Sequence, residues 1–552
     1  MTTTISPTLL ETRIESQRRH AKWQLYLGFF GLAIGLLMGF LQAMDRLGID
    51  LYDAFQLESY YQGLTLHGVS LAFVLTFTFA NGFLSLTVMK SLDRPLANDF
   101  LSLGAFWAAA AGTVLAAVAI LMNEATVLYT FYSPLQAAAA FYLGAVLLVV
   151  STWMVSANQL LTLREWRKDN PGEPIPLLAF VSVVSFLMWD LASLGVAVEV
   201  VGFLLPWSLG WVQNTDPLLN RTLFWFTGHP IVYFWLLPAY VSWYMMIPKQ
   251  VGGKLFSAGI VKGVFILFLL LSTPVGLHHQ FTDPGIDEGL KFVHAFLTFG
   301  VFFPSMVTAF TLLAALENGA KSRGGKGVLR WIAKLPWGDP SVVGQLLAML
   351  AFTLGGATGL INASATINTV VHNSSFIPGH FHLTVGTAVA LTIKAVAYWL
   401  VPHLTHQRLF RPKMALAQVW LWFIGVLLFA RGQMASGIEG QPRRLWVQGA
   451  PFIEEGWESG NVLTGLGGTL MFISGVLFFV VIVGTLLSKR EESAEEFEMP
   501  VSGTIHTEKD APKVFDRLGL WMIVAVVLVL IAYVPVLVFT DWTFPSPPWQ
   551  LF

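Results

Sequence analysis

Long apolar runs recur along the whole of this 552-residue chain, and they constrain its fold more than any other feature. An α-helix rises about 1.5 Å per residue, so about 20 apolar residues cross the hydrocarbon core of a bilayer. Short segments of alternating hydrophobicity, which a membrane β-barrel needs, are missing. The sequence therefore predicts an all-α protein, a polytopic transmembrane helix bundle of about thirteen spans in a lipid membrane. The expected spans cover residues 24–44, 63–89, 100–122, 128–157, 177–205, 219–246, 256–277, 289–316, 341–362, 377–401, 414–434, 460–487 and 515–540.

The composition excludes several classes of function. Charged residues make up 12% of the chain, about half of the usual share, which excludes a soluble globular protein. The net charge is −1, and the sequence has no basic patch that could bind nucleic acid. The chain has no cysteine, which excludes disulfides, iron–sulfur clusters and any copper centre bridged by cysteines within it. Any bound metal must therefore rest on histidine, methionine or carboxylate ligands.

Lysine and arginine predict the orientation. Basic residues collect at the N-terminus and in every second loop, for example between Lys321 and Lys334, whereas alternate loops such as 45–58 are acidic. By the positive-inside rule the N-terminus is cytoplasmic, and an odd number of spans puts the C-terminus outside. The polar stretch 489–513 is expected to be a solvated linker, so that residues 1–552 form a single integral-membrane domain.

Six of the 12 histidines fall at one depth of the predicted bundle. His380 and His382 open the span 377–401, and two helical positions are about 200° apart, so their rings point to opposite sides. The other four come from three further spans, all in their outer part. A single buried histidine is more often a hydrogen-bonded interior residue, but six at a shared depth predict a metal-binding layer. The other four are His67, His229, His278 and His279.

Coordination chemistry divides these six imidazoles. A low-spin haem needs two axial imidazoles from facing helices, for which His67 and His382 are one available pair. An oxygen-reactive haem needs one proximal ligand, such as His380. A copper ion suits three imidazoles, which the remaining histidines supply. Tyr233 follows His229 by four residues, so its phenol stands on the same helix face and can give a proton and an electron to bound oxygen.

With these residues in place, the chain closely resembles subunit I of the haem–copper oxidases, specifically the B-type cytochrome c oxidases. The resemblance covers essentially the whole length and rests on the segment Trp225–Tyr233 (WFTGHPIVY), the pair His278-His279 and the triplet His380-Phe381-His382. It implies a low-spin, b-like haem on His67 and His382, a high-spin, a-like haem on His380, and a copper ion on His229, His278 and His279. It also implies a covalent bond between Tyr233 and His229.

The resemblance also implies a proton path. The A-type branch has a glutamate where this chain has Ile231, which argues against the A-type route. Tyrosines and hydroxyl residues of the predicted spans fit the B-type path, although such residues also occur as ordinary helix contacts. The path residues are Tyr233, Tyr240, Tyr244, Ser305, Thr308 and Ser257.

Near the outer face, Arg443 and Arg444 form an adjacent basic pair, which we expect to bind haem propionates because arginine pairs with carboxylates through two hydrogen bonds. His372 falls where the family has a histidine near a propionate. The family can have a carboxylate four residues earlier, where this chain has Asn368, which argues against a pH-sensitive role there.

The expected function is electron-driven reduction of O2 to water in a prokaryotic cell membrane, with electrons from cytochrome c and coupled proton translocation. Because the chain lacks cysteine, the family's cysteine-bridged dicopper entry site must belong to a partner, subunit II. One alternative is a nitric oxide reductase, which uses non-haem iron with added glutamates. Tyr233 and the absence of a buried glutamate nearby argue against it. A non-catalytic b-type electron carrier is the other alternative, but it has no use for His229 beside His278 and His279.

Overall fold

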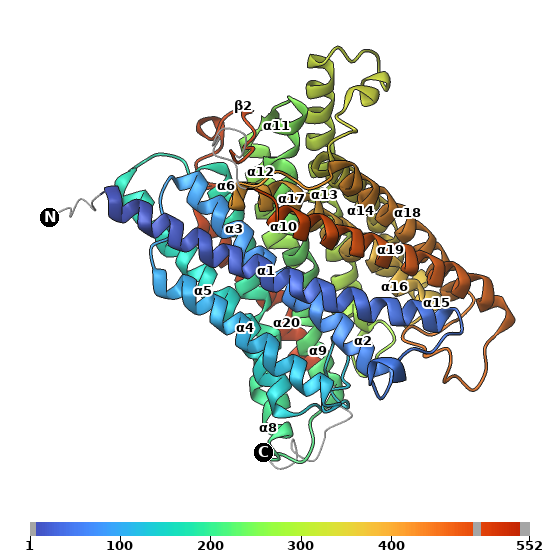
Figure 1. The fold of residues 1–552 in the computed structure, drawn as a ribbon. Helices are drawn as coiled ribbons and strands as arrows, with labels where there is room; N and C mark the ends of the chain where they lie inside the picture. The colour runs from blue at the N-terminus through green and yellow to red at the C-terminus, as the bar shows by residue number, and fades with distance from the viewer. Residues whose placement is uncertain (1–6, 490–497, 541–552) are drawn as a thin grey trace.

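The structure, a computed structural model, describes residues 7–489 and 498–540. Within these residues 13 helical segments are long and apolar enough to cross a membrane, which confirms the predicted all-α bundle. They pack side by side into one bundle (Figure 1). Seven spans are single helices: α1 (Pro7–Arg46), α4 (Asp99–Leu121), α5 (Ala139–Asp169), α13 (Glu288–Ser322), α14 (Pro340–Ala363), α18 (Pro412–Ile438) and α20 (Leu518–Phe539).

The other spans are interrupted or extended by short helical pieces. Spans two and ten each have a π-helical turn near their middle, and span five has one near its end. The pieces are α2 (Tyr60–Val69), η2 (Ser70–Leu75) and α3 (Thr76–Leu92); α6 (Leu177–Ala192), α7 (Leu194–Glu199), η3 (Val200–Leu204) and α8 (Leu205–Ser208); α9 (Pro217–Gly228), α10 (Pro230–Met245) and α11 (Ile247–Val251); α12 (Ala258–Ser272) and η4 (Leu277–Gln280); α16 (Phe376–Leu383), η6 (Thr384–Val389) and α17 (Ala390–Thr405); η7 (Glu455–Trp457) and α19 (Glu458–Leu486).

The remaining elements lie between the spans. They are the short helices η1 (Asp53–Phe55), η5 (Arg330–Lys334), α15 (Ala365–Val371) and η9 (Glu508–Asp510), and two strands, β1 (Leu255–Ser257) and β2 (Thr504–His506). The strands form a two-stranded parallel sheet, which ties the segment before α20 to the start of α12.

Two predicted spans, the first and the fourth, were misplaced. The first span was expected at 24–44, but α1 begins at Pro7, because Arg13 and Gln17 hydrogen-bond to the chain around Leu96 and hold this polar extension against the bundle. The fourth span was expected at 128–157, but α5 runs from Ala139 to Asp169. The apolar residues before it, among them Val127, Leu128 and Phe131, are buried against other helices in a loop, so they are apolar without being helical.

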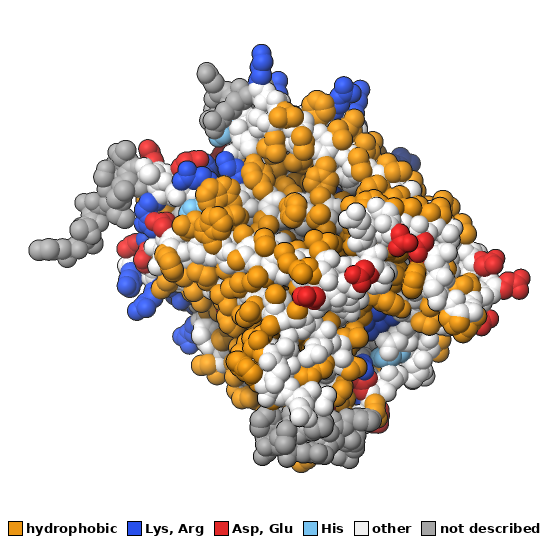
Figure 2. Space-filling view, turned by 60° about the horizontal axis from the view of Figure 1, so that its bottom comes forward, with side chains coloured by type: hydrophobic (Ala, Val, Ile, Leu, Met, Phe, Trp, Pro, Cys, Tyr) orange, Lys and Arg blue, Asp and Glu red, His pale blue; other side chains and the backbone are white. Residues whose placement is uncertain are grey.

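Small residues let neighbouring helices approach closely. Gly112 of α4 and Gly144 of α5 face one another, and a Cβ added to either would lie 2.7 Å from the other's carbonyl oxygen. Without a hydrophobic driving force inside lipid, such close packing is what holds transmembrane helices together. The surface is correspondingly apolar: Figure 2 shows hydrophobic side chains over most of one face, with many Lys and Arg side chains at its left and upper edges.

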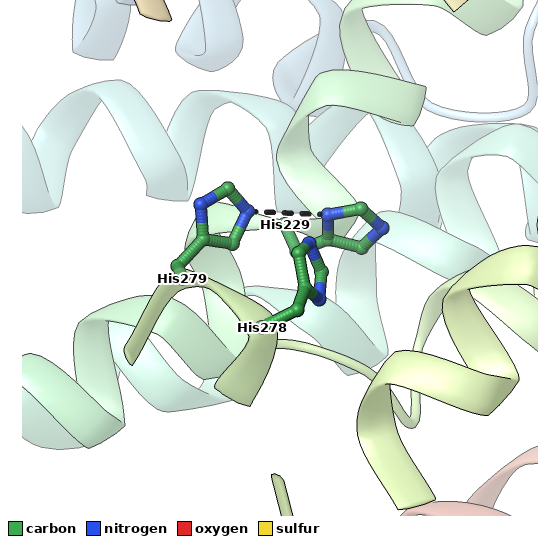
Figure 3. A group of neighbouring side chains, drawn as sticks. All are labelled: His229, His278 and His279. Carbon is green, nitrogen blue, oxygen red and sulfur yellow. Dashed lines mark hydrogen bonds between the residues drawn. The ribbon is translucent and has the colours of Figure 1, made fainter. Parts of the chain in front are cut away.

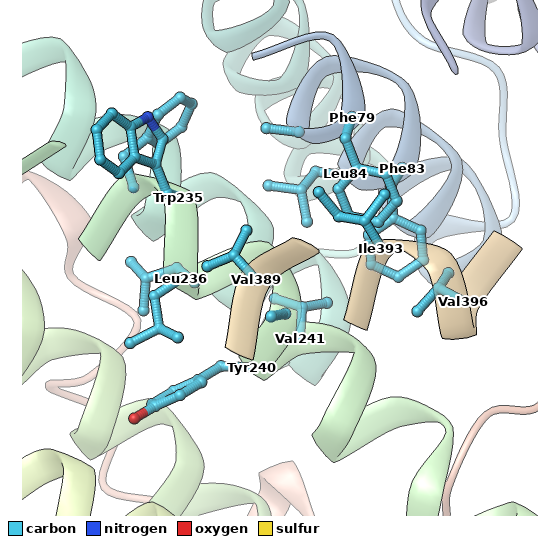
Figure 4. Close-up of a cluster of buried hydrophobic side chains, with 14 of the residues drawn as sticks. Phe79, Phe83, Leu84, Trp235, Leu236, Tyr240, Val241, Val389, Ile393 and Val396 are labelled. Atoms are coloured by element: carbon cyan, nitrogen blue, oxygen red, sulfur yellow. The ribbon is translucent and has the colours of Figure 1, made fainter. Parts of the chain in front are cut away.

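The interior of the bundle is filled with aromatic and branched side chains. Figure 4 shows part of this core, in which side chains of α3, α10 and the segment η6–α17 meet. The labelled residues are Phe79, Phe83, Leu84, Trp235, Leu236, Tyr240, Val241, Val389, Ile393 and Val396. This core adjoins a cavity of about 740 Å³, which Trp235, Leu236 and Val389 help to line and which contains the site described next.

Candidate haem and copper site

The three histidines expected on copper form one cluster. Each of His229, His278 and His279 offers a ring nitrogen, and these atoms lie within 4.8 Å of one another. Nδ1 of His229 and Nε2 of His279 are 3.3 Å apart, as Figure 3 shows. His229 lies at the junction between α9 and α10, and the other two lie in the single turn η4. Three converging imidazoles are a donor set that suits copper.

Neighbouring side chains fix these rings. Trp225 stacks on His279 with ring centroids 3.9 Å apart and an interplanar angle of 5°. The hydroxyl of Thr298 lies 3.0 Å from Nδ1 of His278. Nδ1 is the nitrogen of His229 that faces the cluster, whereas its Nε2 points away from His279 and is buried without a hydrogen-bond partner. The cluster therefore fits a metal ion.

His67 and His382 face each other as expected for a low-spin haem. Their rings are nearly parallel, with centroids 6.3 Å apart and an angle of 17° between the planes. Nδ1 of His67 lies 2.7 Å from the carbonyl oxygen of Gly35, and Nδ1 of His382 lies 2.8 Å from that of Pro378. Such bonds hold each ring with Nδ1–H donating to the backbone, so that each Nε2 is free to bind a metal.

His380 points away from His382, toward α14. Its Nδ1 lies 2.9 Å from the Thr358 hydroxyl and 3.1 Å from the carbonyl oxygen of Gly355. All six histidines line the same cavity, together with Tyr233. Glycines make room for the rings: a Cβ added at Gly359 would lie 3.2 Å from Cε1 of His380. The cavity thus brings together the imidazole donors that two haems and a copper ion would need.

The expected propionate ligands gather at one end of the cavity. Arg443 and Arg444 both line it, and Nη2 of Arg444 is buried without a partner. Burial, and next to it the charge of Arg444, lowers the pKa of Arg443 to about 10, so the guanidinium stays charged at neutral pH. Among the described residues neither arginine forms an ion pair with a carboxylate of this chain. Two half-buried cations that line the cavity without an anion fit propionate groups.

His372 lies at the same end, outside the spans. Its Nδ1 lies 2.9 Å from Oδ1 of Asn368, and its Nε2 is buried without a partner. Burial, followed by the charge of Arg443, lowers the pKa of His372 to about 4. The ring is therefore neutral at pH 7 and has one nitrogen free toward the cavity.

The tyrosines of α10 meet hydroxyls of α13. Ring centroids of His229 and Tyr233 are 5.1 Å apart. The Tyr240 hydroxyl donates to Ser305 at 3.3 Å, and the Tyr244 hydroxyl donates to Thr308 at 2.8 Å. These two pairs form successive steps of one polar row within an apolar core.

Ser257, the sixth residue of the expected path, is not joined to this row. It caps the N-terminus of α12, where its hydroxyl accepts from the backbone N–H of Ile260 at 3.4 Å. None of the hydrogen bonds of residues 7–489 and 498–540 links it to Tyr244 or Thr308. Its place in the path stays a prediction.

The sequence analysis missed several buried polar groups. Glu199, Asp190 and Lys394 are ionisable side chains inside spans, and both carboxylate oxygens of Glu199 lack a partner. The expectation that no buried glutamate lies near the histidines must therefore be refined, because Glu199 is buried in α7 but does not line the cavity. These residues could have been found in the sequence, because each is a single charged residue within a long apolar run.

The fold and the site define a class, a polytopic membrane protein with facing histidines and a three-histidine cluster around one cavity. Comparison with known proteins narrows it. Residues 19–470 match the family described as Cytochrome C and Quinol oxidase polypeptide I. The chain therefore belongs to this family and is a catalytic subunit of a haem–copper terminal oxidase.

Individual relatives agree with this assignment. Cytochrome c oxidase subunit 1 of Thermus thermophilus is 44% identical over 547 residues, which cover 97% of each chain. Cytochrome c oxidase polypeptide 1 of Halobacterium salinarum is 27% identical and covers 70% of this chain and 65% of its own length. A solved heme-copper terminal oxidase dimer has a TM-score of 0.89 and 37% identity, covering 94% of this chain and 92% of that chain.

Proposed function

We propose that this chain reduces O2 to water with electrons from cytochrome c, at a centre formed by a high-spin haem on His380 and copper on His229, His278 and His279. His67 and His382 hold the low-spin haem that delivers the electrons. The observation that carries this proposal is the convergence of all six rings on one cavity. When bound, the haems and the copper supply electron transfer and a binding place for O2.

The protein's own groups manage protons and orientation. Tyr233 lies beside the His229 ring, where its phenol can deliver a proton to the reacting oxygen. The pairs Tyr240–Ser305 and Tyr244–Thr308 can resupply that proton, because each hydroxyl both donates and accepts. The apolar walls of the cavity exclude bulk water, so that protons arrive through these groups.

The remaining assignments belong to the same proposal. The low-spin haem is b-like and the high-spin haem a-like, with propionates held by Arg443, Arg444 and His372. The family resemblance supports a covalent bond between His229 and Tyr233. Residues 1–552 act as one domain in a prokaryotic cell membrane, with the N-terminus cytoplasmic and the C-terminus outside, as the basic loops indicate. The family's entry site for electrons is a dicopper centre bridged by cysteines. This chain has no cysteine, so the site belongs to a partner, subunit II.

Metal analysis with a carbon-monoxide difference spectrum of the purified protein tests the proposal. We expect two haem irons and one copper per chain, and a photolabile carbon-monoxide adduct on one haem only. A third, non-haem iron in place of copper would instead indicate a nitric oxide reductase. No photolabile adduct would indicate an electron carrier whose haems are both six-coordinate.

A further inference from the structure

Lys291 of α13 is a buried lysine that makes three hydrogen bonds to the residues just before it in the chain. It is 3% exposed, and its Nζ donates to the carbonyl oxygen of Phe281 at 3.0 Å and to that of Asp283 at 2.9 Å. Its third bond runs to Oε1 of Glu288, at 2.8 Å. An ammonium group has three N–H donors, so all three are used, and a carboxylate compensates the charge.

The two carbonyl groups come directly after the single turn η4, which carries His278 and His279. Pro274 separates η4 from α12, and Pro284 separates it from α13. Proline interrupts a helix, so η4 is not supported as part of either neighbour. A single turn has little stability of its own, because a short helix does not recover the cost of its nucleation. Its position therefore depends on bonds to the helices around it.

The helix α13 holds this segment at two points. The hydroxyl of Thr298 lies 3.0 Å from Nδ1 of His278, and Lys291 binds the carbonyl groups that follow η4. Lys291 and Thr298 are seven residues apart, about two helical turns, so they share one face of α13. Thr298 orients a ring, whereas Lys291 fixes the path of the backbone.

The other bonds of this segment run through side chains to α9. Gln280 donates to the Thr222 hydroxyl at 3.2 Å and to Oδ2 of Asp283 at 3.0 Å. Asp283 in turn pairs with Arg221 at 2.9 Å. These bonds leave the backbone carbonyl groups of Phe281 and Asp283 to Lys291. Without its ammonium group both carbonyl groups would lose this donor, at a cost in free energy for each.

We propose that Lys291 is a positioning residue for the copper site: its bonds to the two carbonyl groups hold η4 so that His278 and His279 converge with His229. This inference rests on the proposed function, because it requires copper on these three histidines. Their ligand nitrogens lie within 4.8 Å of one another, although His229 is on a different segment from the other two. Lys291 preserves this convergence through the backbone of η4.

The size of the effect follows from known metal sites. Residues that orient metal ligands without touching the metal change the metal affinity by about 10- to 100-fold when they are replaced. We expect the same range for the loss of Lys291. At a chelator concentration that leaves the wild type half loaded, such a variant would keep copper in about 1–9% of its chains.

The experiment is an equilibrium titration of the purified oxidase against a copper chelator, wild type against Lys291→Met, with copper and haem measured per chain. Methionine keeps an unbranched side chain in the buried position. The side chain of Glu288 is 83% exposed, so its charge is left in water, and we expect the variant to fold and to keep both haems. Lys291→Gln has two N–H donors on a shorter side chain and should lose less copper.

A spectroscopic signature accompanies the loss of affinity. In the reduced protein under carbon monoxide, the infrared band of carbon monoxide on copper should be broader in Lys291→Met than in the wild type. The reason is that a loosened η4 lets His278 and His279 occupy several orientations.

Lys321→Met is the matched control. Lys321 also belongs to α13 and also pairs with a glutamate on its own helix, Glu317, at 2.6 Å, but it lies at the other end of the helix from η4. Glu288→Gln is a second control, because it removes the exposed charge and keeps the two carbonyl bonds of Lys291. We expect both controls to hold copper as tightly as the wild type.

The outcomes separate this inference from the proposed function. Wild-type copper affinity in both Lys291 variants would overturn the inference. Loss of the haems together with copper from both variants would also overturn it, because Lys291 would then serve the fold in general. A loss of copper in Lys321→Met as large as in Lys291→Met would have the same meaning. Purified wild-type protein without copper would instead overturn the proposed function.

Discussion

Gly39 of α1 provides the sharpest test of the low-spin haem site, because its missing side chain leaves room for His67. A Cβ built on Gly39 would lie 2.9 Å from Cε1 and 3.0 Å from Nδ1 of the His67 ring, closer than ordinary contacts allow. In the variant Gly39→Ala the ring must therefore turn or shift. It then loses its hydrogen bond to the carbonyl oxygen of Gly35, which is 2.7 Å long in the wild type.

The expected magnitude combines two costs. Overpacking a filled interior costs about 1–3 kcal/mol, and a lost hydrogen bond costs about 1 kcal/mol. The sum of about 2–4 kcal/mol weakens axial binding by roughly 30-fold to several hundredfold, at ~1.4 kcal/mol per factor of ten. The substitution should not destabilise the backbone of α1, since alanine has a higher helix propensity than glycine.

Optical and electron paramagnetic resonance spectra of purified Gly39→Ala measure this loss as a smaller low-spin signal per chain. The control is Gly202→Ala, because Gly202 also lies in a membrane span, is outside the cavity, and has nothing within 4 Å of an added Cβ. We expect this control to keep the full signal. If Gly39→Ala also keeps the full low-spin signal at an unchanged potential, the argument that His67 is an axial ligand in this orientation is wrong.

Three further predictions concern the proton row and the helix that carries His229. Tyr233→Phe should nearly abolish O2 consumption while both haem spectra remain, and normal turnover would contradict its role. Tyr244→Phe removes the donor to Thr308 and should slow proton uptake in single-turnover measurements; Tyr398→Phe, outside the row, is its control. Asp216 caps α9 by accepting from Leu219, so Asp216→Ala should cost about 1 kcal/mol of stability, whereas Asp216→Asn should keep the cap. Because burial raises the pKa of Asp216, the folded state keeps a proton that the unfolded chain releases above about pH 3.9. Stability should therefore decline as the pH rises through that window, and Asp216→Asn should remove the decline in thermal unfolding curves.

Much of the fold could be predicted, because span length and charged breaks are local properties of a sequence. The first and fourth spans were misplaced where local composition was misleading. Arg13 and Gln17 are polar yet helical because they bind the neighbouring loop, and Leu128 is apolar yet lies in a loop because it is buried by other helices. Such tertiary contacts do not appear in the hydropathy of a segment.

The convergence of the six histidines on one cavity could also be predicted, since their depth follows from the spans. Their supporting groups could not. The hydroxyls of Thr298 and Thr358 contact His278 and His380 from other helices, and no spacing in the sequence relates them. Lys394 is visible in the sequence as one charged residue in an apolar run, but its contact with the Trp422 ring on another helix is seen only in the structure.

The breaks in the spans explain how a helical bundle can aim so many rings into one cavity. His67 precedes the π-helical turn η2, and His380 and His382 precede η6, while His229 joins α9 to α10. A π-turn inserts one extra residue, which rotates everything before it by about 100° relative to the helix after it. The part of each span after the break can then pack by its own apolar face, while the part before it turns its histidine toward the cavity. In a regular helix one face would have to pack against neighbouring helices and also carry the histidine. The irregular turns allow different faces of the span to do these two things.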